Sequence, residues 1–566
     1  MPKERILEKE NVSERAKALR RWGYGAWIAV IAGFALLHAW HLRADFPNGS
    51  PWLCDWAKFT DEGWYGNAAI RAHLFGNWYM AGDFNPAVAV PVWPFLEWLL
   101  FFFTGVTVEA ARGLAVACFF LNMVLSYLLL RSRGPHGQVF VRGVGSRKVD
   151  SRSPRWIALL GVTLVVTSPF LYCFTRLAIL EPLQITLTLA ALILAVRLPQ
   201  QRRPVLGSIG IGLLFALIVL TKTTGLFLLP AVLWAMVLPL WEKRKLALCC
   251  ALVMAGAALA AYAAWVALIV SLGLPGDYRY YFFVNTYEKP TEFYWPLVSF
   301  WWSFHGLLWV DHSLILLAGA VVLAAVIAFR SVCGRKLWRD PLFGASLWAV
   351  AGYVLFMTLQ NHPQPRYFAV PAFFCFFVVV LGAETLLDRT CQPNPPSQSD
   401  LTRGLGWAVV VFAAAAAGVH GAQTIRYAAH PEYTWVNAAA QLALYMDTHP
   451  NGKRLLDSIS GDEITLLTKV PSLCDDFGTE DLAPKLAAYQ PGWYATWNDM
   501  DPGTLEDLHS NFSVEQVASF SAFDDPDRNL LVLFKLHPLP NGQMRNPGEQ
   551  NLKVAMPDDK IDIPIE

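Results

Sequence analysis

Long apolar runs recur along the chain and constrain its fold more than any other feature. A helix of about 20 apolar residues crosses the hydrocarbon core of a bilayer. Such runs predict eleven spans, near residues 23–41, 107–130, 156–174, 177–197, 205–221, 223–240, 246–272, 313–329, 342–359, 366–387 and 404–421. The first run lacks a small-residue cleavage site and therefore predicts an uncleaved anchor after a cytoplasmic segment, residues 1–22. The fold class is a polytopic α-helical membrane protein.

Composition agrees with this class and excludes others. Hydrophobic residues make up 55% of the chain and charged residues 16%, and the mean hydropathy is +0.36. A net charge of +1 provides no basic surface for nucleic acid. The Cys and His residues lack the spacing of a structural zinc site. Cys54 and Cys474 could pair in an oxidising compartment, but two free thiols are the favoured interpretation.

Charge distribution predicts the orientation in the membrane. Residues 91–105 are apolar but too short for a regular span, which favours an interfacial helix along the outer surface. The loop 131–155 carries seven Arg or Lys residues against the single acid Asp150, and such an excess belongs in the cytoplasm. The loops 41–106 and 273–312 and everything after residue 421 then lie outside. We expect an integral protein of a bacterial inner membrane, with its site on the extracytoplasmic face.

The composition changes after the last predicted span. Residues 23–421 form the predicted transmembrane domain, and residues 422–540 alternate strand-like and helix-like patterns. This region predicts a small extracytoplasmic α/β domain with about five strands, and the DDPDRN stretch indicates a hairpin turn before the last strand. No glycine-rich phosphate loop occurs in it, so a packing or acceptor-guiding cap is the favoured role. The Pro-rich, charged residues 541–566 predict a disordered tail.

Two adjacent acids, Asp61 and Glu62, open a helical pattern in the first outer loop. If an activated sugar is presented on a lipid phosphate, the phosphate leaves readily, and the enzyme must mainly deprotonate the acceptor and position the two substrates. A carboxylate in this loop can accept that proton. Asp61 is the candidate base, and Glu62 would orient it, bind the acceptor or bind a metal. The alternative is that the two acids only stabilise the first turn of the helix.

Glu181 is the third candidate catalytic residue. It lies near the outer end of a predicted span, where an ionisable group is costly and usually functional. The alternative is a structural ion pair with Arg176. Asp61 and Glu181 are also possible ligands of a divalent cation, the one cofactor that the sequence leaves open.

Cations and aromatic residues near the outer boundary are candidates for substrate binding. Lys222 and Arg366 lie beside turns at span ends, where they could bind a lipid phosphate, although interfacial snorkelling is an alternative for each cation. The full set of predicted substrate-binding residues is Tyr65, Asn85, Arg176, Lys222, Lys289, His362, Arg366 and Tyr367.

At the level of motifs, the chain resembles the GT-C glycosyltransferases of the protein O-mannosyltransferase and aminoarabinose-transferase type. The matching stretches are TDEGWYGNAAIRAHLFGNWY, FNP with PVWPFLEWLL, RLAILEP, LTKTTG and PRYFAVP, in order over residues 20–390. The resemblance implies a polyprenyl-phosphate-linked sugar donor, Asp61 as the catalytic carboxylate and Glu181 as the second acidic residue. Many relatives have Lys before Pro in the first loop, whereas this chain has Asn85.

The resemblance leaves the sugar and the acceptor open, and the acceptor could be a lipid, a glycan or a protein. Two other classes remain. A flippase or transporter of lipid-linked sugars would carry its polar residues near the midplane of the membrane. A non-catalytic membrane scaffold would need no converging acids and cations.

Overall fold

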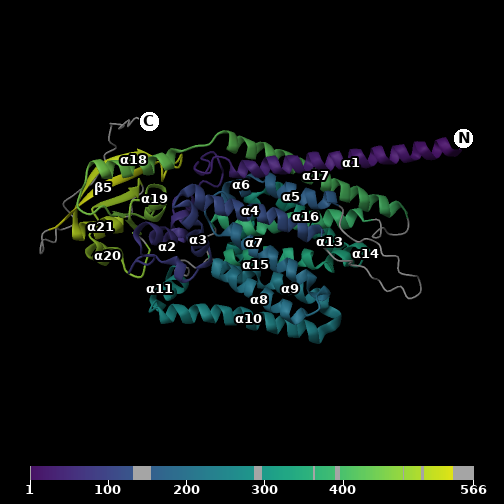
Figure 1. Cartoon of the computed structure of the whole chain (residues 1–566), viewed down its shortest axis with the longest axis horizontal. Coiled ribbons are helices and arrows are strands. Elements are labelled where there is room, and N and C mark those ends of the chain that lie inside the picture. Colours follow the sequence, from purple (N-terminus) through teal and green to yellow (C-terminus); the bar gives the residue numbers. More distant parts are fainter. Residues whose placement is uncertain are drawn as a thin grey trace.

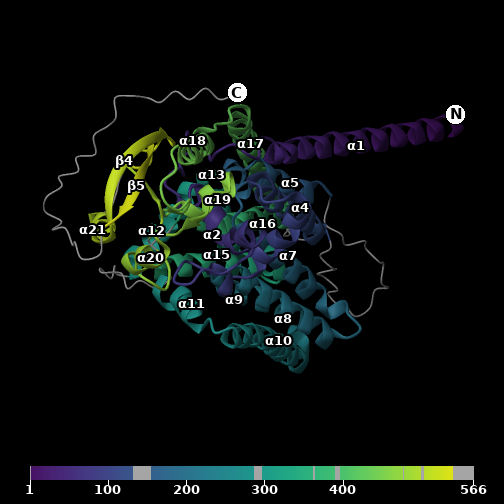
Figure 2. The same ribbon diagram turned by 60° about the vertical axis from the view of Figure 1, so that its left-hand side comes forward.

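The computed structural model describes residues 2–131, 155–285, 296–360, 364–388, 396–475, 477–498 and 502–539. Figure 1 shows a bundle of helices with a small sheet domain at one end, beside α2. The long helix α1 (Pro2–Ala39) leaves the bundle at the opposite end, and Figure 2 shows the same arrangement after rotation. The helical membrane fold with a C-terminal sheet domain is therefore confirmed.

The helices of the bundle and of its connecting loops differ widely in length. They are α2 (Asp61–Phe75), α3 (Val92–Thr104), α4 (Val108–Arg131), α5 (Arg155–Thr167), α6 (Pro169–Thr175), α7 (Glu181–Arg197), α8 (Pro204–Thr221), α9 (Leu229–Val237), α10 (Arg244–Ser271), α11 (Pro275–Arg279), α12 (Pro296–Val310), α13 (His312–Ile327), α14 (Val332–Trp338), α15 (Pro341–Gln360), α16 (Ala369–Leu387) and α17 (Pro396–Ala429). Short 3-10 turns lie between some of them, among them η1 (Trp56–Lys58), η4 (Thr223–Leu228), η5 (Leu238–Lys243) and η7 (Pro365–Phe368).

Eight helices in the described residues are long and apolar enough to cross a membrane, or up to ten if each of two bent pairs counts as one span. The difference from the predicted eleven lies at residues 223–271, which form one helical stretch of 49 residues. At about 1.5 Å per residue, such a stretch is far longer than the hydrocarbon core is thick. Two crossings fit it better than one, and the number eleven stays a prediction.

Both bent pairs have a local cause. Helices α5 and α6 meet at an angle of 64°, where Pro169 opens α6 and the Ser168 side chain accepts a hydrogen bond from the amide of Leu171. Helices α12 and α13 meet at 117°, where Asp311 caps α13 in the same way through the amide of Leu314. The predicted spans 156–174 and 313–329 therefore belong to broken helices.

Helix α3 occupies the segment predicted to be interfacial. One of its faces is buried and includes Trp93 and Phe101, while Phe102 and Phe103 are 60% and 88% exposed. The helix ends at Gly105, whose φ of 69° is accessible to glycine at little cost. A short apolar helix with exposed aromatic residues is typical of the membrane interface.

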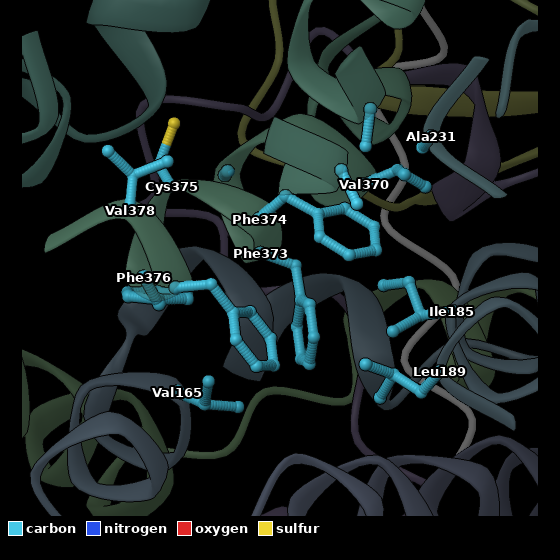
Figure 3. Packing of buried hydrophobic residues seen from close by; sticks show 14 of the residues in the cluster. Val165, Ile185, Leu189, Ala231, Val370, Phe373, Phe374, Cys375, Phe376 and Val378 are labelled. Carbon is cyan, nitrogen blue, oxygen red and sulfur yellow. The ribbon is translucent and has the colours of Figure 1, made fainter. Parts of the chain in front are cut away.

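The centre of the bundle is built around α16. Phe373 and Phe374 of this helix pack beside Ile185 and Leu189 of α7, and Val165 of α5 lies nearby (Figure 3). Nearly every residue of α16 is buried, which agrees with a helix that is apolar on all sides. Because lipid is as apolar as these side chains, close packing rather than exclusion of water holds such helices together.

The C-terminal region folds into a five-stranded sheet of order β2-β1-β3-β5-β4. Its elements are α18 (Thr434–Thr448), β1 (Leu456–Asp457), α19 (Gly461–Thr468), β2 (Ser472–Leu473), α20 (Leu482–Tyr489), β3 (Trp493–Trp497), α21 (Pro502–Asn511), β4 (Phe512–Ser521) and β5 (Leu530–Pro538). Strand β1 pairs in parallel with β2 and β3, and β5 pairs antiparallel with β3 and β4. The sheet and the hairpin turn at DDPDRN are as predicted.

The sheet domain docks closely on the first outer loop. A Cβ atom at Gly63 of α2 would lie 2.1 Å from the backbone nitrogen of Glu463 in α19, so only glycine permits this approach. Arg71 of α2 forms ion pairs with Asp462 (2.9 Å) and Asp83 (2.7 Å). These buried contacts join the domain firmly to the loop that carries Asp61.

Cys54 and Cys474 are both free thiols, as favoured from the sequence. Cys54 is exposed and Cys474 is buried in the domain interface, where its backbone amide donates to Asp83.

The predicted orientation can be tested with two exposed positions. In a background with Cys54 and Cys249 changed to Ser, we expect Lys453→Cys to react with a membrane-impermeant maleimide in intact cells. Arg202→Cys, in the loop between α7 and α8, should react only after permeabilisation, because that loop is predicted to be cytoplasmic. Labelling of both positions from the same side would contradict the orientation.

Candidate functional site

Asp61 is the first residue of α2 and is 1% exposed. Its Oδ2 atom lies 2.8 Å from Nε of Arg366, and its Oδ1 accepts a hydrogen bond from the Thr60 hydroxyl (3.2 Å). Thr60 holds the N-cap position, and its side chain makes no capping hydrogen bond. The Asp61 carboxylate therefore lies in the first turn of α2, where an acid is favourable, and also faces the guanidinium group of Arg366.

Arg366 is positioned by a second carboxylate, Asp55. Asp55 Oδ1 accepts from Nη1 of Arg366 (2.6 Å), and Oδ2 accepts from its backbone nitrogen (2.7 Å). Asp55 also caps η1 by accepting from the Ala57 amide (2.8 Å). Sequence reasoning missed Asp55, although its position six residues before Asp61, at the start of a short helical turn, was a usable signal.

Glu181 and Lys222 form a buried ion pair between the start of α7 and the end of α8. The alternative pairing of Glu181 with Arg176 is thus wrong. Lys222 Nζ lies 4.4 Å from the ring centre of Tyr367, and Cζ of Arg366 lies 4.9 Å from the same ring. Tyr367 therefore links the two ion pairs. We call Asp55, Asp61, Glu181, Lys222, Arg366 and Tyr367 the charged cluster.

The charged cluster contains three carboxylates and two cations, so charge is not balanced within it. Burial raises the pKa of Asp61 to about 6, and the positive charge of Arg366 opposes this rise. Oε2 of Glu181 is buried without a hydrogen-bond partner in the described structure. The cluster thus offers an unpaired acceptor and a carboxyl group that titrates close to neutral pH, both of which suit proton transfer.

From the sequence, Asp61 and Glu181 are possible ligands of a divalent cation. Each of them is paired with a cation, and no group of three His, Cys, Asp or Glu residues that could hold an ion occurs within the described ranges. The structure therefore gives no argument for a particular metal site.

Glu62 lies outside the charged cluster. Its two carboxylate oxygens accept from Nε (2.7 Å) and Nη2 (2.6 Å) of Arg112 in α4, and Oε1 also accepts from the Ala178 amide (2.7 Å). Arg112 donates further to the carbonyl oxygens of Leu42 and Ala44. Glu62 therefore ties α2 to the bundle.

Arg176 also forms hydrogen bonds outside the charged cluster. It donates to the hydroxyl of Tyr172 (2.6 Å) and to the carbonyl oxygens of Trp40 (2.7 Å) and His41 at the end of α1. These contacts hold the chain where it leaves α1, directly after Ala39. Arg176 thus lies apart from the charged cluster.

Two of the four remaining predicted binding residues, Tyr65 and Asn85, lie within the described part of the chain. Tyr65 is near the charged cluster, since burial and then the charge of Asp61 raise its pKa well above the ordinary value. Asn85 instead donates to Oδ1 of Asp277 in α11 (3.0 Å), and Oδ2 of Asp277 accepts from the Tyr79 hydroxyl (3.1 Å). Lys289 and His362 lie outside the described residues.

The helical bundle with helices α2 and α3 in its first outer loop and a C-terminal α/β domain is a fold that solved structures share. ArnT from Cupriavidus metallidurans has this fold: its apo crystal structure aligns at 14% identity and a TM-score of 0.56, over 90% of this chain and 98% of that one. The structure of ArnT bound to undecaprenyl phosphate aligns over the same shares at 14% identity and a TM-score of 0.52.

The archaeal oligosaccharyltransferase AglB from Archaeoglobus fulgidus, in complex with an inhibitory peptide and a dolichol-phosphate, aligns at 12% identity and a TM-score of 0.47 over 91% of this chain and 75% of that one. No family model and no curated protein matches the sequence. At such low identity the likeness to ArnT concerns the fold, and the resemblance predicted from the motifs is confirmed at that level.

Proposed function

We propose that this protein is an integral-membrane glycosyltransferase that moves a sugar from a polyprenyl-phosphate donor to a lipid, glycan or protein acceptor. The observation that carries the proposal is the buried Asp61–Arg366–Asp55 arrangement, with the Glu181–Lys222 pair across the Tyr367 ring. We place this charged cluster on the extracytoplasmic face, because the basic loop 131–155 is predicted to be cytoplasmic.

In the proposed reaction, Asp61 accepts the proton of the attacking acceptor group. The acceptor atom forms a bond to the anomeric carbon, and the bond from that carbon to the phosphate oxygen breaks, with its electron pair leaving on the phosphate. Lys222 and Arg366 offset the charge on the phosphate through charge-assisted hydrogen bonds. Attack from the face opposite the phosphate inverts the anomeric centre and requires no glycosyl-enzyme intermediate.

Two further considerations support a lipid-phosphate donor. The ArnT structure that shares the fold was solved with undecaprenyl phosphate bound. In addition, the charged cluster is assembled from the first outer loop, the start of α7, the end of α8 and η7, so it lies where helices end. A headgroup held at the surface could reach such a place, and a transporter would require polar groups along a path through the bundle.

The direct test is transfer by the purified protein in lipid nanodiscs. We expect a radiolabelled sugar to move from one of several polyprenyl-phosphate donors to a lipid, glycan or peptide acceptor. The same protein in liposomes serves to detect movement of the donor between leaflets. Movement without transfer for any donor and acceptor would replace this proposal with the flippase alternative.

The pH dependence of transfer tests the state of Asp61. A general base must be deprotonated, and burial raises the pKa of Asp61 to about 6. We therefore expect kcat/KM to fall as the pH is lowered through about 6 and to level off above it, because kcat/KM reports the pKa values of the free enzyme. A kcat/KM that is constant from pH 5 to pH 8 would contradict a carboxylate base with this pKa in the free enzyme.

A further inference from the structure

The turn between β4 and β5 contacts the first outer loop close to the charged cluster. Residues 522–529 form this turn, closed by a hydrogen bond from the Ala522 amide to the carbonyl oxygen of Asn529 (2.8 Å). Asp525 in the turn places Oδ2 2.7 Å from Nζ of Lys58, and the two side chains are 11% and 1% exposed. The C-terminal domain thus forms a buried ion pair with the loop that carries Asp55 and Asp61.

Lys58 stabilises the short segment of chain that contains Asp55. It is the last residue of η1, and its Nζ also donates to the carbonyl oxygen of Leu53. Asp55 caps the same turn through the Ala57 amide. Lys58 thus ends the turn and its side chain bonds back to Leu53, which precedes the turn. The position of the Asp55 carboxylate therefore depends on this short turn.

Two cation–π contacts also join the β4–β5 turn to the first outer loop. Lys58 Nζ lies 4.6 Å from the ring centre of Phe523, and Cζ of Arg528 lies 4.9 Å from that of Phe59. Each side of the contact thus supplies one cation and one ring. The turn and residues 58–59 therefore form one packed unit.

A continuous series of contacts leads from this unit to the reacting group. Asp525 pairs with Lys58, Asp55 of the same segment holds Arg366 through two hydrogen bonds, and Arg366 lies 2.8 Å from Asp61. Every charged side chain in this series is at most 11% exposed. Because none of these buried side chains can move freely into solvent, a displacement of Lys58 should shift Asp55, Arg366 and Asp61 as well.

We propose that Asp525 is a positioning residue, which acts through Lys58 to hold Asp55, Arg366 and Asp61 in the arrangement that transfer requires. This inference rests on the proposed function and assigns a role to the C-terminal domain. A displacement of about 1 Å at a reacting group can lower a rate by about 100-fold. Because Asp525 acts through several contacts, we expect a smaller loss, about tenfold.

The test compares Asp525→Asn with Asp525→Glu in the full-length protein. Asn removes the charge and should lower the turnover number about tenfold, while KM for the donor changes less than about twofold. Glu keeps the charge and should recover most of the turnover. Asp447→Asn is the matched control, because it breaks an ion pair of equal length (2.7 Å), with Arg454, on the exposed surface of the same domain.

Hydrogen exchange supplies a readout that does not depend on transfer. Asp525→Asn should accelerate amide exchange in residues 53–61 and leave β3 and β5 unchanged, whereas Asp447→Asn should change neither. The double variant Lys58→Met, Asp525→Leu removes both buried charges together and should fold even if the single variant does not. We expect it to show the same local acceleration and the same loss of turnover.

The outcomes separate this inference from the proposed function. If the wild-type protein transfers no sugar, the proposed function fails, and the exchange data still test the contact. Unchanged exchange at residues 53–61 in the folded variants would overturn the positioning role. So would a variant that raises KM alone, or an Asp525→Glu variant as slow as Asp525→Asn.

Discussion

Replacing Asp61 with Asn is expected to lower sugar transfer by about 100-fold or more while the protein remains folded. The amide has nearly the shape of the carboxylate but cannot accept a proton, so the base is removed with little change in packing. Arg366 keeps two hydrogen bonds to Asp55, which should hold it in place. Donor binding should therefore change far less than turnover.

This prediction is measured as turnover with saturating donor, with donor binding and thermal unfolding recorded for the same samples. NMR of the wild-type product gives its anomeric configuration, which should be opposite to that of the donor. Full activity in Asp61→Asn, or a product that retains the donor configuration, would count against the proposed mechanism. Asp447→Asn again provides a matched loss of one carboxylate, here on the exposed surface of the C-terminal domain.

Replacing Arg112 with Met should have the largest effect on stability. Arg112 and Glu62 are 2% and 0% exposed, and the change leaves the Glu62 carboxylate with only the Ala178 amide as a partner. Breaking a buried pair from one side typically costs about 3–5 kcal/mol. We expect a markedly lower unfolding temperature in detergent and little folded protein on size-exclusion chromatography.

The double variant Glu62→Gln, Arg112→Met distinguishes the two roles of Glu62. It removes both charges, so much of the lost stability should return. If Glu62 only ties α2 to the bundle, the folded double variant should keep a substantial part of its transfer activity. A well-folded double variant as inactive as Asp61→Asn would show that Glu62 takes part in the reaction.

Adjacent residues on a helix illustrate the limit of reading a site from sequence. Asp61 and Glu62 were predicted to act together because they are neighbours in the chain. Side chains at consecutive helical positions do not face each other, and here Asp61 meets Arg366 while Glu62 meets Arg112. Sequence adjacency therefore could not indicate that the two acids have different partners.

The partners of the other charges show the same limit. The sequence singled out Glu181, Lys222 and Arg366 as candidates because ionisable groups near span ends are costly and uncommon, and the structure brings the three into the charged cluster. The sequence could not pair Glu181 with Lys222 or bring Asp55 to Arg366, since 41 and 311 residues separate these partners along the chain. Nothing local encodes a contact between such distant segments.

By itself, the sequence determined the membrane class, the apolar segments, the short apolar α3 and the five-stranded C-terminal domain, because each depends on local hydropathy or periodicity. Only the tertiary structure decided which charges meet, where α5–α6 and α12–α13 bend, and how the β4–β5 turn reaches Lys58. The physical reason is that buried charges require partners, and those partners are supplied by whichever helix ends and loops the packed bundle brings together.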